Sequence, residues 1–284
     1  MSVYPQLAAS AASFGFAAFG AAEACALGPD AERRLQEYLS EGRNADMDYM
    51  GRNVAKRLDV TLLVEGARSV MAFLVPYSHH NDPQIASFAH GEDYHKIIKD
   101  RIHAFVAANR EALDVAAGGA FSYRVFTDSA PVMEREWAVR CGLGFIGCNN
   151  FLISPVAGLR TLIGTLVCNV PFEAIDCEQL RAQKEAVPDG CGACGACIEA
   201  CPTGALMSPF KIDARRCISF LTIEARNRDN SSPQVHGHLF GCDCCMDACP
   251  WNRDVEGWPE FSSNADRLAD KPSDIFSIFA RQRK

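Results

Sequence analysis

Long apolar runs are scarce in this sequence, and their scarcity excludes several classes of protein. The stretch that looks most apolar, residues 7–27, is built mostly of alanine, glycine and serine, contains Glu23 and follows no basic residue. Such a segment fits neither a secretory signal peptide nor a membrane-spanning helix. We therefore expect a cytoplasmic protein without a membrane partner.

An excess of positive charge is also missing. The 284 residues carry 28 basic and 35 acidic side chains, a net charge of −7, and neither half of the chain is basic. Charge alone therefore does not predict a nucleic-acid-binding module. The hydrophobic content of 48% is sufficient for a large core, so we expect the chain to fold alone, as a monomer.

Cysteine, by contrast, is abundant and unevenly placed. Of the 14 cysteines, five lie in residues 1–190 and nine in residues 191–249. A disulfide-rich secreted protein would be smaller and would carry a secretion signal, so reduced thiols are the better interpretation. The change in density predicts a first domain at residues 1–180, a cysteine-rich domain at residues 181–255 and a tail at residues 256–284.

Before this boundary, helical and strand patterns alternate. Continuous or alternating apolar runs predict strands at residues 16–19, 70–75, 121–126, 151–153 and 161–168. Helical spacing of apolar residues predicts helices ending near Gly15 and spanning residues 94–113 and 130–141. The pattern indicates an α+β domain followed by a loop-rich cysteine domain.

The downstream cysteines follow the spacing of iron–sulfur proteins. Cys191, Cys194, Cys197 and Cys201 with Pro202 form C-x2-C-x2-C-x3-C-P, in which three thiolates bind one [4Fe–4S] cluster and the fourth binds a second. A second motif, C-x2-C-x3-C-P, is formed by Cys242, Cys245, Cys249 and Pro250, and Leu239 occupies the place of its first cysteine. Cys217, which lies between the two motifs, completes the count of eight. The crossing rule assigns Cys191, Cys194, Cys197 and Cys249 to cluster one, and Cys201, Cys217, Cys242 and Cys245 to cluster two.

Two alternatives remain open at this point. Cys-x2-Cys pairs also bind zinc, so a pair of zinc knuckles would use the same residue types. Cys244 could replace Cys242 or Cys245 as a ligand, although its spacing fits less well. The remaining cysteines are interpreted as small buried hydrophobic residues: Cys25, Cys141, Cys148, Cys168 and Cys177.

Several short motifs occur across the chain. They are Tyr-His-Lys at 94–96, Asp-Ser-Ala-Pro at 128–131, Gly-Leu-Gly-Phe-Ile-Gly at 142–147, Cys-Ile-Ser-Phe-Leu-Thr-Ile at 217–223, Gly-Cys-Asp at 241–243 and Cys-Pro-Trp-Asn at 249–252. Together these motifs resemble those of the epoxyqueuosine reductase family, and the similarity runs from about residue 15 to residue 253.

The resemblance implies a nitroreductase-like cobalamin-binding domain followed by a bacterial ferredoxin-like domain with two [4Fe–4S] clusters, as in the related reductive dehalogenases. The family removes the epoxide oxygen of epoxyqueuosine in the tRNA anticodon loop, giving queuosine. The resemblance also implies an external one-electron donor, such as flavodoxin or ferredoxin. A free modified nucleoside or another small electrophile is an alternative substrate.

The resemblance also assigns site residues. Asp128 matches the family's proton donor, and we expect burial at the end of an apolar strand to raise its pKa. Alternatively, Asp128 or Ser129 caps a helix that begins near Pro131. The residues that match cobalamin contacts are Arg57, Asp128, Leu152, Ile163, Ser219 and Asp243. Ordinary core packing would explain apolar residues at Leu152 and Ile163 as well as a cobalamin contact does. Arg57 could instead be a surface charge, and Ser219 could cap a helix.

The sequence departs from the family in three places. Cys148-Asn-Asn replaces the usual Lys-Asn, and His236-Gly-His replaces the usual Gly-Asn-Arg. The sequence ends at Lys284, where longer members continue into a HEAT-like repeat. The redox centres are therefore predicted more strongly than the tRNA substrate. The competing hypothesis is a non-catalytic, ferredoxin-like electron-transfer protein that serves a partner enzyme.

Overall fold

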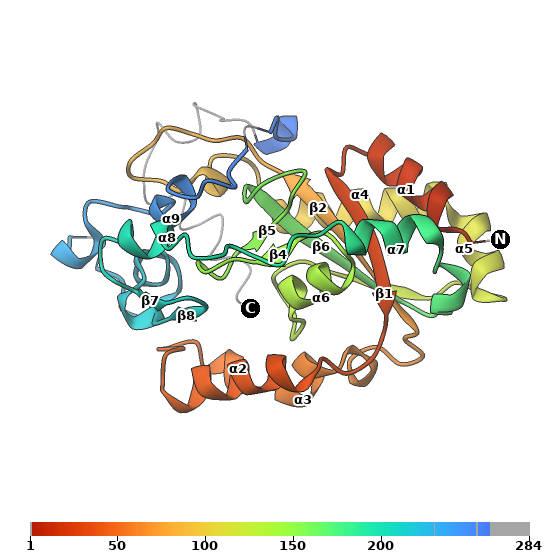
Figure 1. Cartoon of the computed structure of the whole chain (residues 1–284), viewed down its shortest axis with the longest axis horizontal. Coiled ribbons are helices and arrows are strands. Elements are labelled where there is room, and N and C mark those ends of the chain that lie inside the picture. The colour runs from red at the N-terminus through yellow and green to blue at the C-terminus, as the bar shows by residue number, and fades with distance from the viewer. Residues whose placement is uncertain (1, 230, 254, 262–284) are drawn as a thin grey trace.

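A four-stranded antiparallel sheet organises the first part of the molecule (Figure 1). The structure is a computed structural model that describes residues 2–229, 231–253 and 255–261. The strands run in the order β1-β2-β6-β3. Their bounds are β1 Ala18–Glu23, β2 Ser69–Pro76, β3 Tyr123–Phe126 and β6 Thr161–Cys168. The part of the predicted tail beyond residue 261 lies outside the described residues.

The central strand β2 is buried on both faces, as its continuous apolar run predicts. Its alternate side chains enter two different cores, because successive side chains of a strand point to opposite faces. Phe73 packs with Ile102 and Phe105 in one core, whereas Leu74 packs with Trp137 in the other. Helices therefore cover both faces of the sheet.

The first core is covered by α1 Tyr4–Ser13, α4 Tyr94–Ala108, α5 Arg110–Ala117 and α7 Glu178–Glu185. The second core is covered mainly by α6 Glu134–Arg140 and by residues from α2 Pro29–Ser40. A short helix, α3 Val54–Leu58, follows α2 after a 3-10 turn at Asp48–Gly51. Figure 1 shows α2 and α3 along the same edge of the molecule.

Cysteine-containing loops form the opposite end of the molecule from α5 (Figure 1). Their regular elements are short: α8 Ala196–Glu199, β7 Leu206–Ser208, β8 Lys211–Ile212, a π-helical turn at Phe220–Glu224 and α9 Cys244–Asp247. Met246 and Cys249 belong to the same buried cluster as Tyr77 and Phe145. The cysteine-rich region therefore packs directly on the sheet-containing part.

Most predicted elements are confirmed, with changes of extent; β3, for example, begins at Tyr123 rather than at residue 121. The first strand is Ala18–Glu23 rather than residues 16–19. The long helix predicted at 94–113 breaks at Asn109, whose side chain bonds to the Phe105 carbonyl and to Ser10 Oγ. Helix α6 begins at Glu134 rather than near residue 130.

The predicted domain boundary at residues 180/181 falls inside α7, and Leu180 is fully buried in the first core. The division into three parts stays a prediction. None of the helices within the described residues combines the length and the apolar character that a membrane crossing requires.

Gly20 permits close packing between β1 and the end of α6. A Cβ atom at this position would lie 2.0 Å from the carbonyl oxygen of Cys141, which is backbone and cannot rotate away. We expect Gly20→Ala to lower the free energy of unfolding by roughly 1–3 kcal/mol, the usual cost of overpacking. The matched control is Gly51→Ala, because its nearest neighbour would be a flexible leucine methyl at 4.0 Å. Equal urea midpoints for the two variants would contradict this account.

Candidate active site and iron–sulfur centres

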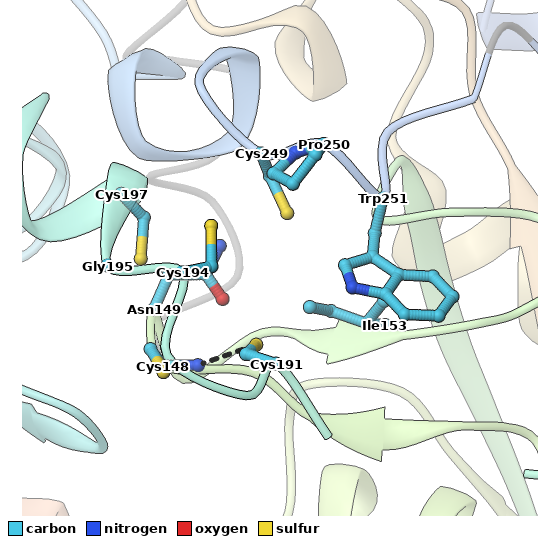
Figure 2. A pocket seen from close by; sticks show the side chains of 10 residues that line it. All are labelled: Cys148, Asn149, Ile153, Cys191, Cys194, Gly195, Cys197, Cys249, Pro250 and Trp251. Atoms are coloured by element: carbon cyan, nitrogen blue, oxygen red, sulfur yellow. Dashed lines mark hydrogen bonds between the residues drawn. The ribbon is translucent and has the colours of Figure 1, made fainter. Parts of the chain in front are cut away.

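Four cysteines from two distant segments line one cavity. Cys191, Cys194 and Cys197 lie before and within α8, whereas Cys249 directly follows α9. In Figure 2 their sulfur atoms face a common space. These are the four residues that the crossing rule assigns to cluster one, so the structure brings the predicted set together. Cys194 is exposed at the surface, whereas Cys197 and Cys249 are buried.

The cysteines assigned to cluster two also lie close together. Burial raises the pKa of the Cys245 thiol, and the nearby charges of Cys217 and Cys201 raise it further. Burial also raises the pKa of Cys217, with a smaller contribution from Cys201. Such thiols become thiolates most readily when a bound cation compensates their charge. This environment therefore fits a metal cluster.

Cys244 stays an alternative ligand for cluster two. The possible ligand atoms of His238, Cys242 and Cys244 lie within 4.8 Å of one another. Hydrogen bonds from Cys242 and His238 lower the pKa of Cys244 to about 4, which favours its thiolate.

Asp128 lies on the loop that follows β3, as the sequence predicts, but its environment differs from the expected one. The side chain is exposed rather than buried, so the predicted burial is wrong. The backbone adopts a left-handed conformation with φ of +49°, which turns the residue away from the strand end. The helix-cap alternative is also wrong, because α6 begins at Glu134 and no side chain caps it.

Tyr94 and Glu134 hold Asp128 from two sides. The Tyr94 hydroxyl donates a hydrogen bond to Asp128 Oδ2 at 2.7 Å. Burial, and then the charge of Asp128, keep the pKa of Tyr94 well above its usual value, so the phenol stays a donor. The Asp128 backbone N–H donates to both carboxyl oxygens of Glu134, at 2.9 and 3.0 Å.

Sequence reasoning missed the roles of Tyr94 and Glu134. Tyr94 lies in the Tyr-His-Lys motif, whose pattern predicts no role for it, and Glu134 lies in the predicted helix at residues 130–141. A signal for Glu134 was available: it is an acidic residue only six positions after Asp128, at the start of a helix. The distance between Tyr94 and Asp128 along the chain leaves no comparable local signal.

Glu134 has an unusual pKa. Burial raises its pKa to about 8, and the negative charge of Asp128 adds to this effect. A carboxyl group with a raised folded-state pKa favours folding fully below its unfolded value of 4.5, and that contribution is lost as the pH rises through about 8.

We therefore expect the stability of Glu134→Gln to change less than that of the wild type between pH 4.5 and pH 8. The wild type should lose on the order of a few kcal/mol relative to the variant over this range. The glutamine amide oxygen can still accept the Asp128 N–H, so the comparison isolates the charge. Urea unfolding across the pH series measures it, and parallel curves would contradict the raised pKa.

The residues that match cobalamin contacts occupy different environments. Arg57 is buried rather than a surface charge, and it donates to the Tyr49 carbonyl at 2.9 Å. Its buried Nε has no hydrogen-bond partner among the described residues. Asp243 Oδ2 accepts the Ser87 N–H at 2.7 Å. Ser219 bonds to the Cys217 thiol rather than capping the following turn.

Leu152 and Ile163 contribute apolar surface to the second core. Leu152, in β5 Leu152–Ile153, is buried there, and Ile163, in β6, packs against it. The Ile163 carbonyl accepts a hydrogen bond from Thr127 Oγ1 at 2.6 Å, so this strand supports the loop of Asp128. Ile163 is therefore connected through Thr127 to the loop that carries Asp128.

Comparisons with known proteins agree with these features. Residues 190–252 match the 4Fe-4S double cluster binding domain, and residues 57–129 match the family described as Epoxyqueuosine reductase QueG, DUF1730. An epoxyqueuosine reductase of Cyclobacterium marinum is 38% identical over 253 residues, covering 86% of this chain and 77% of that protein. The chain belongs to the epoxyqueuosine reductase family. The double-cluster match favours iron–sulfur clusters over the zinc knuckles.

Other members of the epoxyqueuosine reductase family show the same relationship. The protein of Leadbetterella byssophila is 36% identical over 250 residues, covering 85% of this chain and 77% of that protein. The crystal structure of an epoxyqueuosine reductase with a tRNA-Tyr epoxyqueuosine-modified tRNA stem loop has a TM-score of 0.76 and 25% identity, covering 92% of this chain and 69% of that one. The Streptococcus thermophilus enzyme has a TM-score of 0.75 and 25% identity, covering 97% and 75%. The α+β fold is thus shared with this family.

Proposed function

We propose that this chain reduces epoxyqueuosine in tRNA to queuosine. The observation that carries the proposal is the exposed Asp128 carboxyl group, bonded to Tyr94 and held through its backbone by Glu134. This acid lies on the same chain as two sets of four cysteines. The named activity of the relatives and the tRNA stem loop in one related structure support the substrate.

The eight assigned cysteines are proposed to hold the two [4Fe–4S] clusters. Cys191, Cys194, Cys197 and Cys249 would hold cluster one, because they share one cavity. Cluster two would be held by Cys201, Cys217, Cys242 and Cys245. Burial and neighbouring thiols of this set raise the pKa values of Cys217, Cys242 and Cys245, which supports the assignment. Cys197 of the first set packs in one cluster with Cys201 and Cys245 of the second, so the two sets are neighbours, which suits electron transfer between them.

Cobalamin is the proposed second cofactor, and the residues present fit it. Arg57 offers a buried Nε that lacks a partner among the described residues, which suits a polar group of the corrin ring. Ser219 and Asp243 would contribute polar contacts, and Leu152 and Ile163 apolar ones. When bound, cobalamin supplies a low-valent cobalt centre that can cleave a carbon–oxygen bond.

Residues of this chain would supply the proton that the departing epoxide oxygen takes up. Asp128 would donate a proton from its carboxyl group to the departing epoxide oxygen, because its exposed side chain can reach a bound substrate. The Tyr94 hydroxyl would fix the orientation of that carboxyl group through the bond to Oδ2. An external one-electron donor, such as flavodoxin or ferredoxin, would reduce the clusters.

Anaerobic turnover tests the proposal directly. Reconstituted protein would be incubated with cobalamin, a strong reductant and epoxyqueuosine-containing tRNA, and the nucleosides would be analysed by mass spectrometry. We expect the modified nucleoside to lose one oxygen atom. A parallel reaction with the free nucleoside distinguishes the two substrates: conversion of the free nucleoside alone would contradict the tRNA substrate. No conversion in either reaction, with both cofactors bound, would contradict the proposed activity.

A further inference from the structure

A fifth cysteine lines the cavity of cluster one. Cys148 lies in the turn between β4 Phe145–Ile146 and β5, and only 4% of its surface is exposed. Figure 2 shows it beside Cys191 at the edge of the space that the four assigned cysteines surround. The proposed ligand set leaves Cys148 without a role, because four cysteines already match four irons.

Cys148 presents two groups to the sulfur of Cys191. Its backbone N–H donates to Cys191 Sγ at 3.5 Å, within the range of hydrogen bonds to sulfur. Its side chain lies in a buried cluster against which Cys191 packs, so the two side chains are neighbours. The side chain packs against Cys197 and Leu206, so it belongs to the cluster region rather than to the cores of the sheet.

The turn that carries Cys148 is fixed against the cysteine-rich region. The Cys148 carbonyl accepts the Phe210 N–H at 3.2 Å. The neighbouring Asn149 donates from Nδ2 to the Cys245 carbonyl at 3.4 Å. These bonds join the turn to the cysteine-rich region at two points. A side chain held in this way keeps a constant position relative to Cys191.

We propose that Cys148 is a positioning residue for cluster one, which stabilises the negative charge on the Cys191 sulfur and thereby raises the reduction potential of that cluster. The inference rests on the ligand set proposed above. Reduction adds negative charge to a cluster and its thiolates, and hydrogen bonds to sulfur stabilise that charge. Removing the thiol of Cys148 should therefore make cluster one harder to reduce.

Redox titration of the anaerobically reconstituted chain, followed by EPR, tests this inference. Cys148→Ala should keep its full iron content, shift the potential of one cluster to a lower value and leave the other unchanged. Cys148→Ser retains a hydrogen-bond donor and should restore part of the shift. Cys168→Ala, which removes a buried thiol from the first core, is the matched control and should leave both potentials unchanged.

Three outcomes would overturn the inference. Unchanged potentials in Cys148→Ala with full iron content would show that the thiol does not influence the cluster. Loss of about half the iron from Cys148→Ala would show that Cys148 is itself a ligand of one of two equal clusters. Wild-type protein that binds no iron would contradict the proposed ligand set as well, so that failure is distinguishable from the other two.

Discussion

Replacing Asp128 by asparagine is expected to lower the rate of epoxyqueuosine reduction by at least about 100-fold, the lower range of the contribution of a general acid. Asparagine cannot donate a proton from a carboxyl group, but it can still accept the Tyr94 hydroxyl bond through its amide oxygen. It also tolerates the left-handed backbone at φ +49°. The loss should therefore reflect chemistry rather than folding.

Single-turnover rates at saturating tRNA measure this effect, with iron content and thermal unfolding recorded on the same sample. Tyr94→Phe is the matched variant, because it removes one hydrogen bond to Asp128 and keeps the carboxyl group. We expect a smaller loss for Tyr94→Phe than for Asp128→Asn. Wild-type turnover by Asp128→Asn would exclude Asp128 as the acid.

Replacing Cys217 by serine is expected to remove one of the two clusters and to stop turnover. Cys217 lies outside both cysteine motifs, yet its partly buried side chain lies beside Cys201 and Cys245. A serine hydroxyl is a weak ligand for iron because iron–sulfur clusters are held by thiolates. The iron content should fall to about half that of the wild type, since each proposed cluster holds the same number of irons.

Iron analysis and EPR of the reconstituted protein measure the loss. Cys25→Ser is the control, because Cys25 is exposed, bonds to Arg140 and belongs to neither proposed set. It should retain all of its iron and its activity. Full iron content in Cys217→Ser would mean that another thiol, such as Cys244, completes cluster two.

Much of the sheet could be predicted from the sequence, because buried strands appear as local runs of apolar residues. The apolar run at residues 70–75 and the strand at residues 161–168 lie in the two inner strands, where both faces need apolar side chains. The break at Asn109 could not be predicted in the same way. Apolar spacing continues across it to Leu113, and the side-chain bond to Ser10 joins residues far apart in the sequence.

In the candidate site, too, features encoded in a local motif could be predicted, whereas features that depend on distant residues could not. The cysteine sets could be predicted because ligand spacing and the crossing rule are properties of the motif itself. The exposure of Asp128 could not, because a strand end does not determine the direction in which the following loop turns. The contact of Cys148 with Cys191 spans 43 residues, and no periodicity encodes it.

The most direct test of the central claim is the corrinoid content of the anaerobically reconstituted wild-type chain. Iron and cobalt would be measured on the same gel-filtered sample after incubation with excess cobalamin. A reductase that combines electron supply and reaction centre in one chain should retain about one corrinoid per chain together with both clusters. Full iron content without bound corrinoid would contradict this account and would favour an electron-transfer protein that serves a separate enzyme.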